Sequence, residues 1–228
     1  PDGPRLPTNA AILTFDDGYI DHYDNVYPTL KKQGIQGYFF PPAKAVSERK
    51  VLDVNKIHFV LASVSDKSGI VQDIFELMDE FRRDAGLVSN EEYYQTYAVA
   101  TRFDTPEVVF IKRILQKGLP AECRSEAAHR LFTRYVTEDE ESFAAELYMN
   151  VDQLNVMAKD GMYIGSHSFD HLWMDTQPES VQSSELDSSL KFLDSIHDAP
   201  SNWGFNYPYG AYNDSLLGLL KARGCKFG

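Results

Sequence analysis

The most informative stretch of this chain is Ala10-Ala11-Ile12-Leu13-Thr14-Phe15-Asp16-Asp17-Gly18. Its apolar first half is typical of a buried strand, and it ends on two adjacent carboxylates and a glycine. Adjacent like charges repel each other, so Asp16 and Asp17 together indicate a nearby metal cation and a reacting water. A plain strand followed by an Asp-Gly turn is the alternative that this stretch alone leaves open.

A helix and a second strand follow at short intervals. Tyr23, Val26 and Leu30 recur at helical spacing. Pro28 suits the first turn of that helix, and Gly34 is placed to end it. Residues 35–40 then have the pattern of a second strand. The order strand, helix, strand favours a parallel sheet or barrel, which places this protein in the α/β class.

The stretch from Ser47 to Asn150 is different, because nearly every segment of it predicts helix. One such helix carries an apolar stripe at Ile70, Ile74, Leu77 and Phe81. Pro106 follows Thr105 at another predicted helix start. Thr137 and Glu140 have the spacing of a capping box before a further helix.

The strand-and-helix pattern resumes after Asp160-Gly161. It predicts strands at 162–165 and 203–207, helices along 186–196 and 216–222, and the beginning of a strand at 225–228. We therefore expect residues 1–46 and 151–228 to form one α/β scaffold. Residues 47–150 are expected to be a helical insertion into it.

Composition excludes several classes of partner. The 228 residues include 22 Lys and Arg against 34 Asp and Glu, a net charge of −12, which argues against nucleic acid and anionic membranes. No stretch approaches the ~20 apolar residues of a membrane span. Cys123 and Cys225 predict neither a disulfide framework nor a cysteine zinc site. No signal segment follows Pro1, which slightly favours the cytoplasm over the cell envelope.

The second chemical motif is Ser166-His167-Ser168-Phe169-Asp170-His171, directly after a predicted strand. Two histidines and one carboxylate are a recurrent catalytic zinc set, and the carboxyl ends of parallel strands share one rim. His167, His171 and an aspartate of the first motif are therefore candidate ligands. The other histidines are expected to be ordinary polar side chains: His22, His58, His129 and His197.

The third motif is Phe205-Asn206-Tyr207-Pro208-Tyr209-Gly210, again at the end of a predicted strand. It can be an aromatic strand closed by a turn, or the wall of a groove whose backbone N–H groups point at a substrate. Trp173, close to the second motif, is a further candidate for substrate binding. The aromatic side chains that could stack on sugar rings are Tyr19, Phe169, Trp173, Tyr207 and Tyr209.

These motifs, in this order, resemble those of the polysaccharide deacetylase family (NodB-homology, carbohydrate esterase 4-like). The resemblance covers residues about 8–42 and 160–228, with the helical insertion outside it. It is carried by residues 14–18 and 166–171, and residues 207–210 are similar to most of the third family motif. It implies an irregular (β/α) barrel and a metal-dependent hydrolase that removes acetyl groups from an N-acetylated sugar or polysaccharide, such as one of the cell envelope.

The resemblance also implies a role for each motif residue. Asp17, His167 and His171 would hold a divalent metal, usually zinc, and Asp16 would be the general base that takes a proton from the attacking water. The backbone N–H of Tyr209 would stabilise the oxyanion. The groove residues that would bind substrate are Asn206, Tyr207, Pro208 and Trp173.

The sequence departs from the family pattern in two places. Asn206 stands where the family usually has an arginine paired with the base, so Asp16 would be oriented by a hydrogen bond without a positive charge. No C-terminal histidine serving as general acid precedes Gly228, and about five strands are predicted against about seven in the family barrel. We expect a further C-terminal portion, or a homo-oligomer, to cover the open barrel edge.

Two other functions stay open at this point. One is hydrolysis of a small cyclic amide, and the other is binding of sugar or metal without turnover, suggested by Asn206 and the missing acid. A purely structural reading requires three independent coincidences at strand ends.

Overall fold

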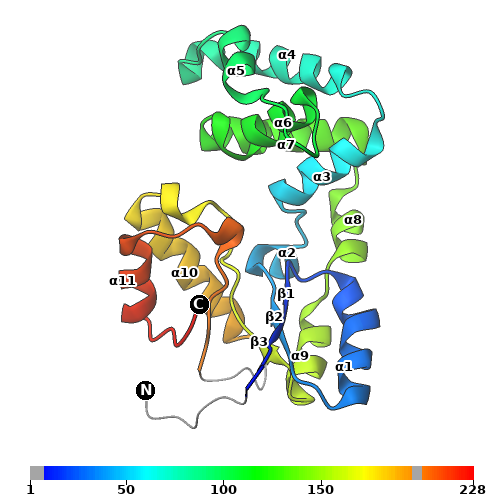
Figure 1. The fold of residues 1–228 in the computed structure, drawn as a ribbon, viewed down its shortest axis with the longest axis vertical. Coiled ribbons are helices and arrows are strands. Elements are labelled where there is room, and N and C mark those ends of the chain that lie inside the picture. The colour runs from blue at the N-terminus through cyan, green and yellow to red at the C-terminus, as the bar shows by residue number, and fades with distance from the viewer. Residues whose placement is uncertain (1–7, 197–201) are drawn as a thin grey trace. The chain divides into compact units, whose positions relative to one another are not determined.

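The computed structural model describes residues 8–196 and 202–228 (Figure 1). His197 lies outside the described residues. The chain divides into two compact units, one made of Pro1–Lys50 with Ala144–Gly228 and the other of Val51–Phe143. No helix of the described chain is both long and apolar enough to cross a membrane.

The first unit combines a parallel sheet with helices, as the sequence predicts. In chain order its elements are β1 (Leu13–Asp16), the π-helical turn η1 (His22–Val26), α1 (Tyr27–Gln33), β2 (Gly37–Phe40), α2 (Ala43–Ser47), α9 (Val151–Lys159), β3 (Tyr163–Ile164), the short turn η3 (Met174–Thr176), α10 (Glu179–Leu193), the turn η4 (Pro208–Gly210) and α11 (Asp214–Ala222).

The sheet has the order β1-β2-β3, and all pairs are parallel. Leu13 pairs with Gly37, and Tyr38 pairs with Tyr163. Beyond β3, Ser166 forms a parallel bridge with Phe205, whose N–H donates to the carbonyl of Phe227 at 3.0 Å. Among the described residues, segment 203–207 thus has a single bridge at Phe205 in place of the predicted strand, and 225–228 forms no strand, so these two strand predictions are wrong.

The first helix begins and ends where the sequence predicts a proline start and a glycine stop. Pro28 lies in the first turn of α1, and Gly34 has φ of 65°, a conformation that glycine adopts without steric cost. The π-helical turn η1 before it was not predicted from the sequence.

The prediction that the first strand is buried is wrong. Ile12 and Leu13 are 66% and 42% exposed, because β1 lies at the end of the sheet and has β2 as its one hydrogen-bonded neighbour among the described strands. Phe15 is the residue of β1 that faces the core, where its ring stacks on Phe39 at 5.0 Å.

Helices α9, α10 and α11 contribute buried side chains to the core of this unit, together with α1 and α2. The predicted helix along 186–196 is α10, which begins earlier, at Glu179, and ends at Leu193; Leu186 and Leu193 are buried on it. Fully buried residues of this core include Phe39, Leu154, Met157, Ile164, Leu186, Phe205 and Leu216. This packing fixes the strands whose carboxyl ends carry the motifs.

The second unit is helical throughout its regular structure. Its elements are α3 (Asp53–Ser63), α4 (Ser68–Ala85), α5 (Asn90–Tyr97), α6 (Pro106–Arg113), the π-helical turn η2 (Ile114–Gly118), α7 (Ala121–Tyr135) and the start of α8 (Glu140–Leu147). Ile70, Ile74 and Leu77 of α4 are buried as predicted, and Phe81 is half-buried.

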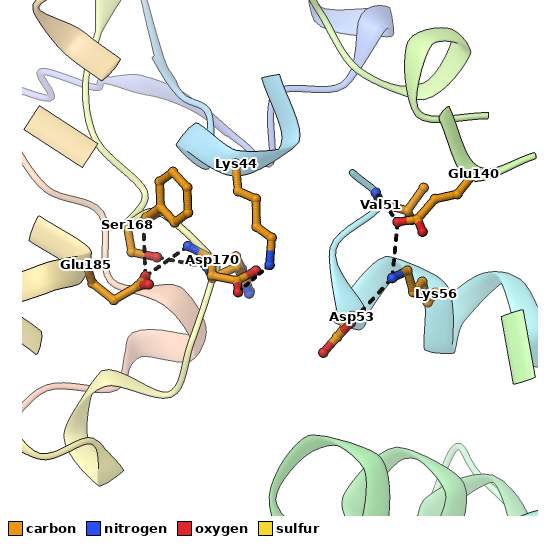
Figure 2. Close-up of polar contacts among 10 residues, drawn as sticks. Lys44, Val51, Asp53, Lys56, Glu140, Ser168, Asp170 and Glu185 are labelled. Atoms are coloured by element: carbon orange, nitrogen blue, oxygen red, sulfur yellow. Dashed lines mark hydrogen bonds and ion pairs between the residues drawn. The ribbon is translucent and has the colours of Figure 1, made fainter. Parts of the chain in front are cut away.

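The predicted capping box of Thr137 and Glu140 is wrong. Asp139 caps α8 instead, because its Oδ1 accepts the N–H of Ser142 at 3.0 Å. Glu140 accepts the backbone N–H of Val51 at 3.0 Å and pairs with Lys56 at 3.1 Å (Figure 2). A carboxylate engaged by these partners does not reach back to cap its own helix.

Candidate functional site

Three candidate ligands from two strand ends meet in the first unit. Asp17 directly follows β1, and His167 and His171 belong to the loop after β3. One ligand atom of each lies within 4.8 Å of the others. Asp17 Oδ1 is 3.7 Å from His167 Nε2 and 3.5 Å from His171 Nε2. The parallel sheet brings these side chains together because its strand ends share one edge.

The donor set fits a divalent metal. Two ligand atoms about 2.1 Å from a tetrahedral ion lie roughly 3.4 Å apart, close to the separations found here. Asp17 Oδ2 accepts the hydroxyl of Tyr19 at 3.2 Å, whereas Oδ1 is buried without a hydrogen-bond partner among the described residues. His167 Nδ1 lies 2.8 Å from the carbonyl of Asn206, which directs its Nε2 lone pair toward Asp17.

The backbone of the motifs is left-handed at several side-chain-bearing positions. Of the six non-glycine residues with positive φ in the described chain, four lie in the motifs: Asp17 (68°), Ser168 (63°), His171 (55°) and Tyr209 (60°). Such conformations persist only where the surroundings hold them. Gly18 also has φ of 69°, and a Cβ there would lie 2.9 Å from that of Pro41.

Asp16 and Asn206 form a direct pair beside the three candidate ligands. Asn206 Nδ2 donates to Asp16 Oδ1 at 2.6 Å. The Asp16 carboxylate is exposed and so accessible to a water or a substrate. Asn206 therefore holds the candidate base through its side chain and His167 through its carbonyl.

Aromatic rings flank the second histidine. Tyr209 lies edge-on to His171 at 4.7 Å, and Trp173 stacks on Tyr209 at 4.2 Å with an interplanar angle of 5°. Tyr207 is half-buried and Pro208 is buried. The third motif thus adjoins the ligand loop.

Two ionisable residues near the site have no role predicted from the sequence. His22 lies against Phe15 and Tyr19, and burial lowers its pKa although Asp17 and Asp16 act in the opposite direction. Glu185 of α10 is buried under the histidine loop. Its position in a regular amphipathic helix carries no signal that would distinguish it from a surface glutamate.

The family is shown by comparison with known proteins. A model of the polysaccharide deacetylase family matches residues 4–80 and 96–228, so the chain belongs to this family. The match includes much of the second unit, so the prediction that the family resemblance leaves out the helical segment is wrong. The putative polysaccharide deacetylase YxkH of Bacillus subtilis (strain 168) is 39% identical over 46 residues, 20% of this chain and 16% of that protein.

Two solved structures have a similar fold. The Streptococcus pyogenes deacetylase PplD in complex with acetate has a TM-score of 0.52 at 16% identity, over 98% of this chain and 57% of that chain. IcaB from Ammonifex degensii has a TM-score of 0.51 at 16% identity, over 97% and 60%. The chain thus spans less than two thirds of the length of these proteins.

Glu185 predicts a pH-dependent contribution to stability. Burial raises its pKa to about 7 from an ordinary 4.5, against the opposing effect of backbone hydrogen bonds from the loop. A carboxyl whose pKa is higher in the folded than in the unfolded state stabilises the fold fully at a pH below its unfolded-state pKa. This contribution is lost as the pH rises through its folded-state pKa. We expect the stability of wild type relative to Glu185→Gln to fall by at most about 3 kcal/mol from pH 4 to 8. Denaturant unfolding at each pH measures it, and a pH-independent difference contradicts it.

Proposed function

We propose that this protein is a metal-dependent hydrolase that removes acetyl groups from an N-acetylated sugar or polysaccharide. The observation that carries the proposal is the convergence of Asp17, His167 and His171 beside an Asp16 carboxylate held by Asn206. Membership of the polysaccharide deacetylase family supports the same reaction class. Because the chain spans only part of its relatives, the activity is proposed for the protein to which this chain contributes.

Asp17, His167 and His171 would hold the metal, and zinc suits two imidazoles and one carboxylate. When bound, such an ion acidifies water and polarises a carbonyl oxygen. Asp16 would accept a proton from the attacking water, with Asn206 Nδ2 fixing the orientation of its carboxylate.

The third motif would complete the site next to the loop that carries His167 and His171. The left-handed conformation of Tyr209 turns its backbone within η4, and we propose that its N–H donates to the oxyanion. The stacked faces of Trp173 and Tyr209, with Tyr207 and Pro208, would contact the sugar. For the fold we propose an irregular (β/α) barrel with residues 47–150 inserted, whose open edge is covered by a further C-terminal portion or by a homo-oligomer.

Acetate release from chitooligosaccharides tests this function. We expect release that a chelator abolishes and that added zinc restores, because the proposed reaction depends on the metal. Cyclic ureides and imides, assayed in parallel, are expected to remain intact. Hydrolysis of the cyclic amides alone would instead identify a hydrolase of small cyclic amides. Stoichiometric zinc without turnover of any substrate would identify a binding protein.

We expect Asn206→Ala to lower kcat about 10- to 100-fold while metal content and KM change little. The substitution removes a charge-assisted hydrogen bond to Asp16, which is worth about 1.5–3 kcal/mol, and leaves the backbone carbonyl that contacts His167. Steady-state kinetics on a chitooligosaccharide, with metal analysis, measure the effect. Asn202→Ala, at an exposed position, is the matched control. An unchanged kcat would remove Asn206 from the proposed mechanism.

A further inference from the structure

The loop that carries His167 and His171 needs external support. Ser168 and His171 have φ of 63° and 55°, so the loop follows a path that side-chain-bearing residues seldom adopt unaided. The Ser168 hydroxyl accepts the N–H of His171 at 3.0 Å, which closes the turn locally. This bond does not engage the N–H groups of Phe169 and Asp170 between them.

Glu185 receives both of these N–H groups. Its Oε2 accepts the N–H of Phe169 at 3.1 Å and that of Asp170 at 2.9 Å (Figure 2). The residue is 8% exposed, so these bonds lie where water competes little for the amides. Helix α10 contacts the loop a second time, because the hydroxyl of Ser189 is hydrogen-bonded to that of Ser166.

The opposite side of the loop is held by α2. The N–H groups of Ala43 and Lys44 donate to the carbonyls of Ser168 and Phe169 at 3.1 and 3.0 Å. Lys44 Nζ also pairs with Asp170 at 2.6 Å (Figure 2). The α2 contacts therefore engage carbonyls and a side chain of the loop, whereas Glu185 accepts the amides of Phe169 and Asp170.

We propose that Glu185 is a positioning residue that fixes the histidine loop in the conformation that presents His167 and His171 to the metal. The inference rests on the proposed function, because it assigns these histidines as ligands. Without the carboxylate, two partly buried N–H groups lose their acceptor, and the left-handed turn loses the contact that opposes its relaxation. His171 is next to Asp170 in sequence, so relaxation there displaces a ligand directly.

Cobalt(II) binding tests the proposal, since its visible absorption reports both affinity and ligand geometry. Glu185→Leu removes the acceptor, Glu185→Asp withdraws it by one methylene, and Glu185→Gln keeps an oxygen in place. We expect cobalt affinity about 10- to 100-fold weaker in the first two, with an altered spectrum, which is the range for groups that orient metal ligands. Glu185→Gln is expected to restore the wild-type spectrum. If Glu185→Leu does not fold, the comparison of Glu185→Asp with Glu185→Gln still tests whether Glu185 positions the loop.

Two control variants separate positioning from general stability. Leu190→Ala weakens the core contacts of α10 without touching the loop, and Glu179→Gln changes an exposed carboxylate on the same helix. Both are expected to bind cobalt as wild type does, whatever their melting temperatures. Wild-type affinity and spectrum in Glu185→Leu or Glu185→Asp would overturn the proposal. If wild type itself binds no cobalt, or if Asp17→Ala binds it equally well, the proposed metal site is wrong. The role of Glu185 is then wrong as well.

Discussion

Asp17→Ala is expected to abolish metal binding and to lower acetate release at least about a thousandfold. Asp17 Oδ1 faces both histidine Nε2 atoms, so its removal leaves the two imidazoles without the carboxylate that completes the set. A catalytic metal contributes several kcal/mol to transition-state stabilisation, which corresponds to this factor. Metal content after dialysis and the initial rate of acetate release measure the effect.

The same loss is expected for His167→Ala and His171→Ala. His58→Ala is the matched control, because His58 is exposed and lies outside the ligand cluster. It is expected to keep both metal and activity. Stoichiometric metal in all three ligand variants would show that the ion binds elsewhere.

Asp16→Asn is expected to retain the metal and to lower kcat by about 10² to 10⁴. An amide has nearly the shape of the carboxylate and keeps an oxygen for the Asn206 donor, but it cannot accept the proton of the attacking water. Metal analysis and steady-state kinetics together separate this variant from the ligand variants.

Asp24→Asn makes the same change of charge at an exposed position of η1 and is expected to behave as wild type. Full activity in Asp16→Asn would exclude Asp16 as the base. Loss of the metal in that variant would instead make Asp16 part of the ligand set.

The meeting of the three candidate ligands follows from features that a sequence carries. Asp17 and His167 each follow a strand closely, and a parallel arrangement of strands brings such positions to one edge whatever the side chains around them. The same local reasoning predicts α1, with its proline start and glycine stop. The class of fold could therefore be predicted from short motifs and periodicity.

Features that depend on residues far away in the sequence could not be predicted in this way. The burial of a strand depends on what lies beside it, so Leu13 has a core pattern and an exposed side chain. The capping prediction at Glu140 failed because Lys56, far away in sequence, binds that carboxylate. Glu185 went unnoticed for the same reason, since its acceptor role depends on the histidine loop folding over α10.

The left-handed backbone of the motifs has a consequence for protein engineering. Each such residue costs of the order of 1–3 kcal/mol, and glycine would remove most of that cost. A library selected for heat resistance alone would thus tend to enrich glycine at Asp17, Ser168, His171 and Tyr209. The selected variants would be more stable but would have lost residues of the proposed catalytic centre, so selection on this scaffold should include turnover from the first round.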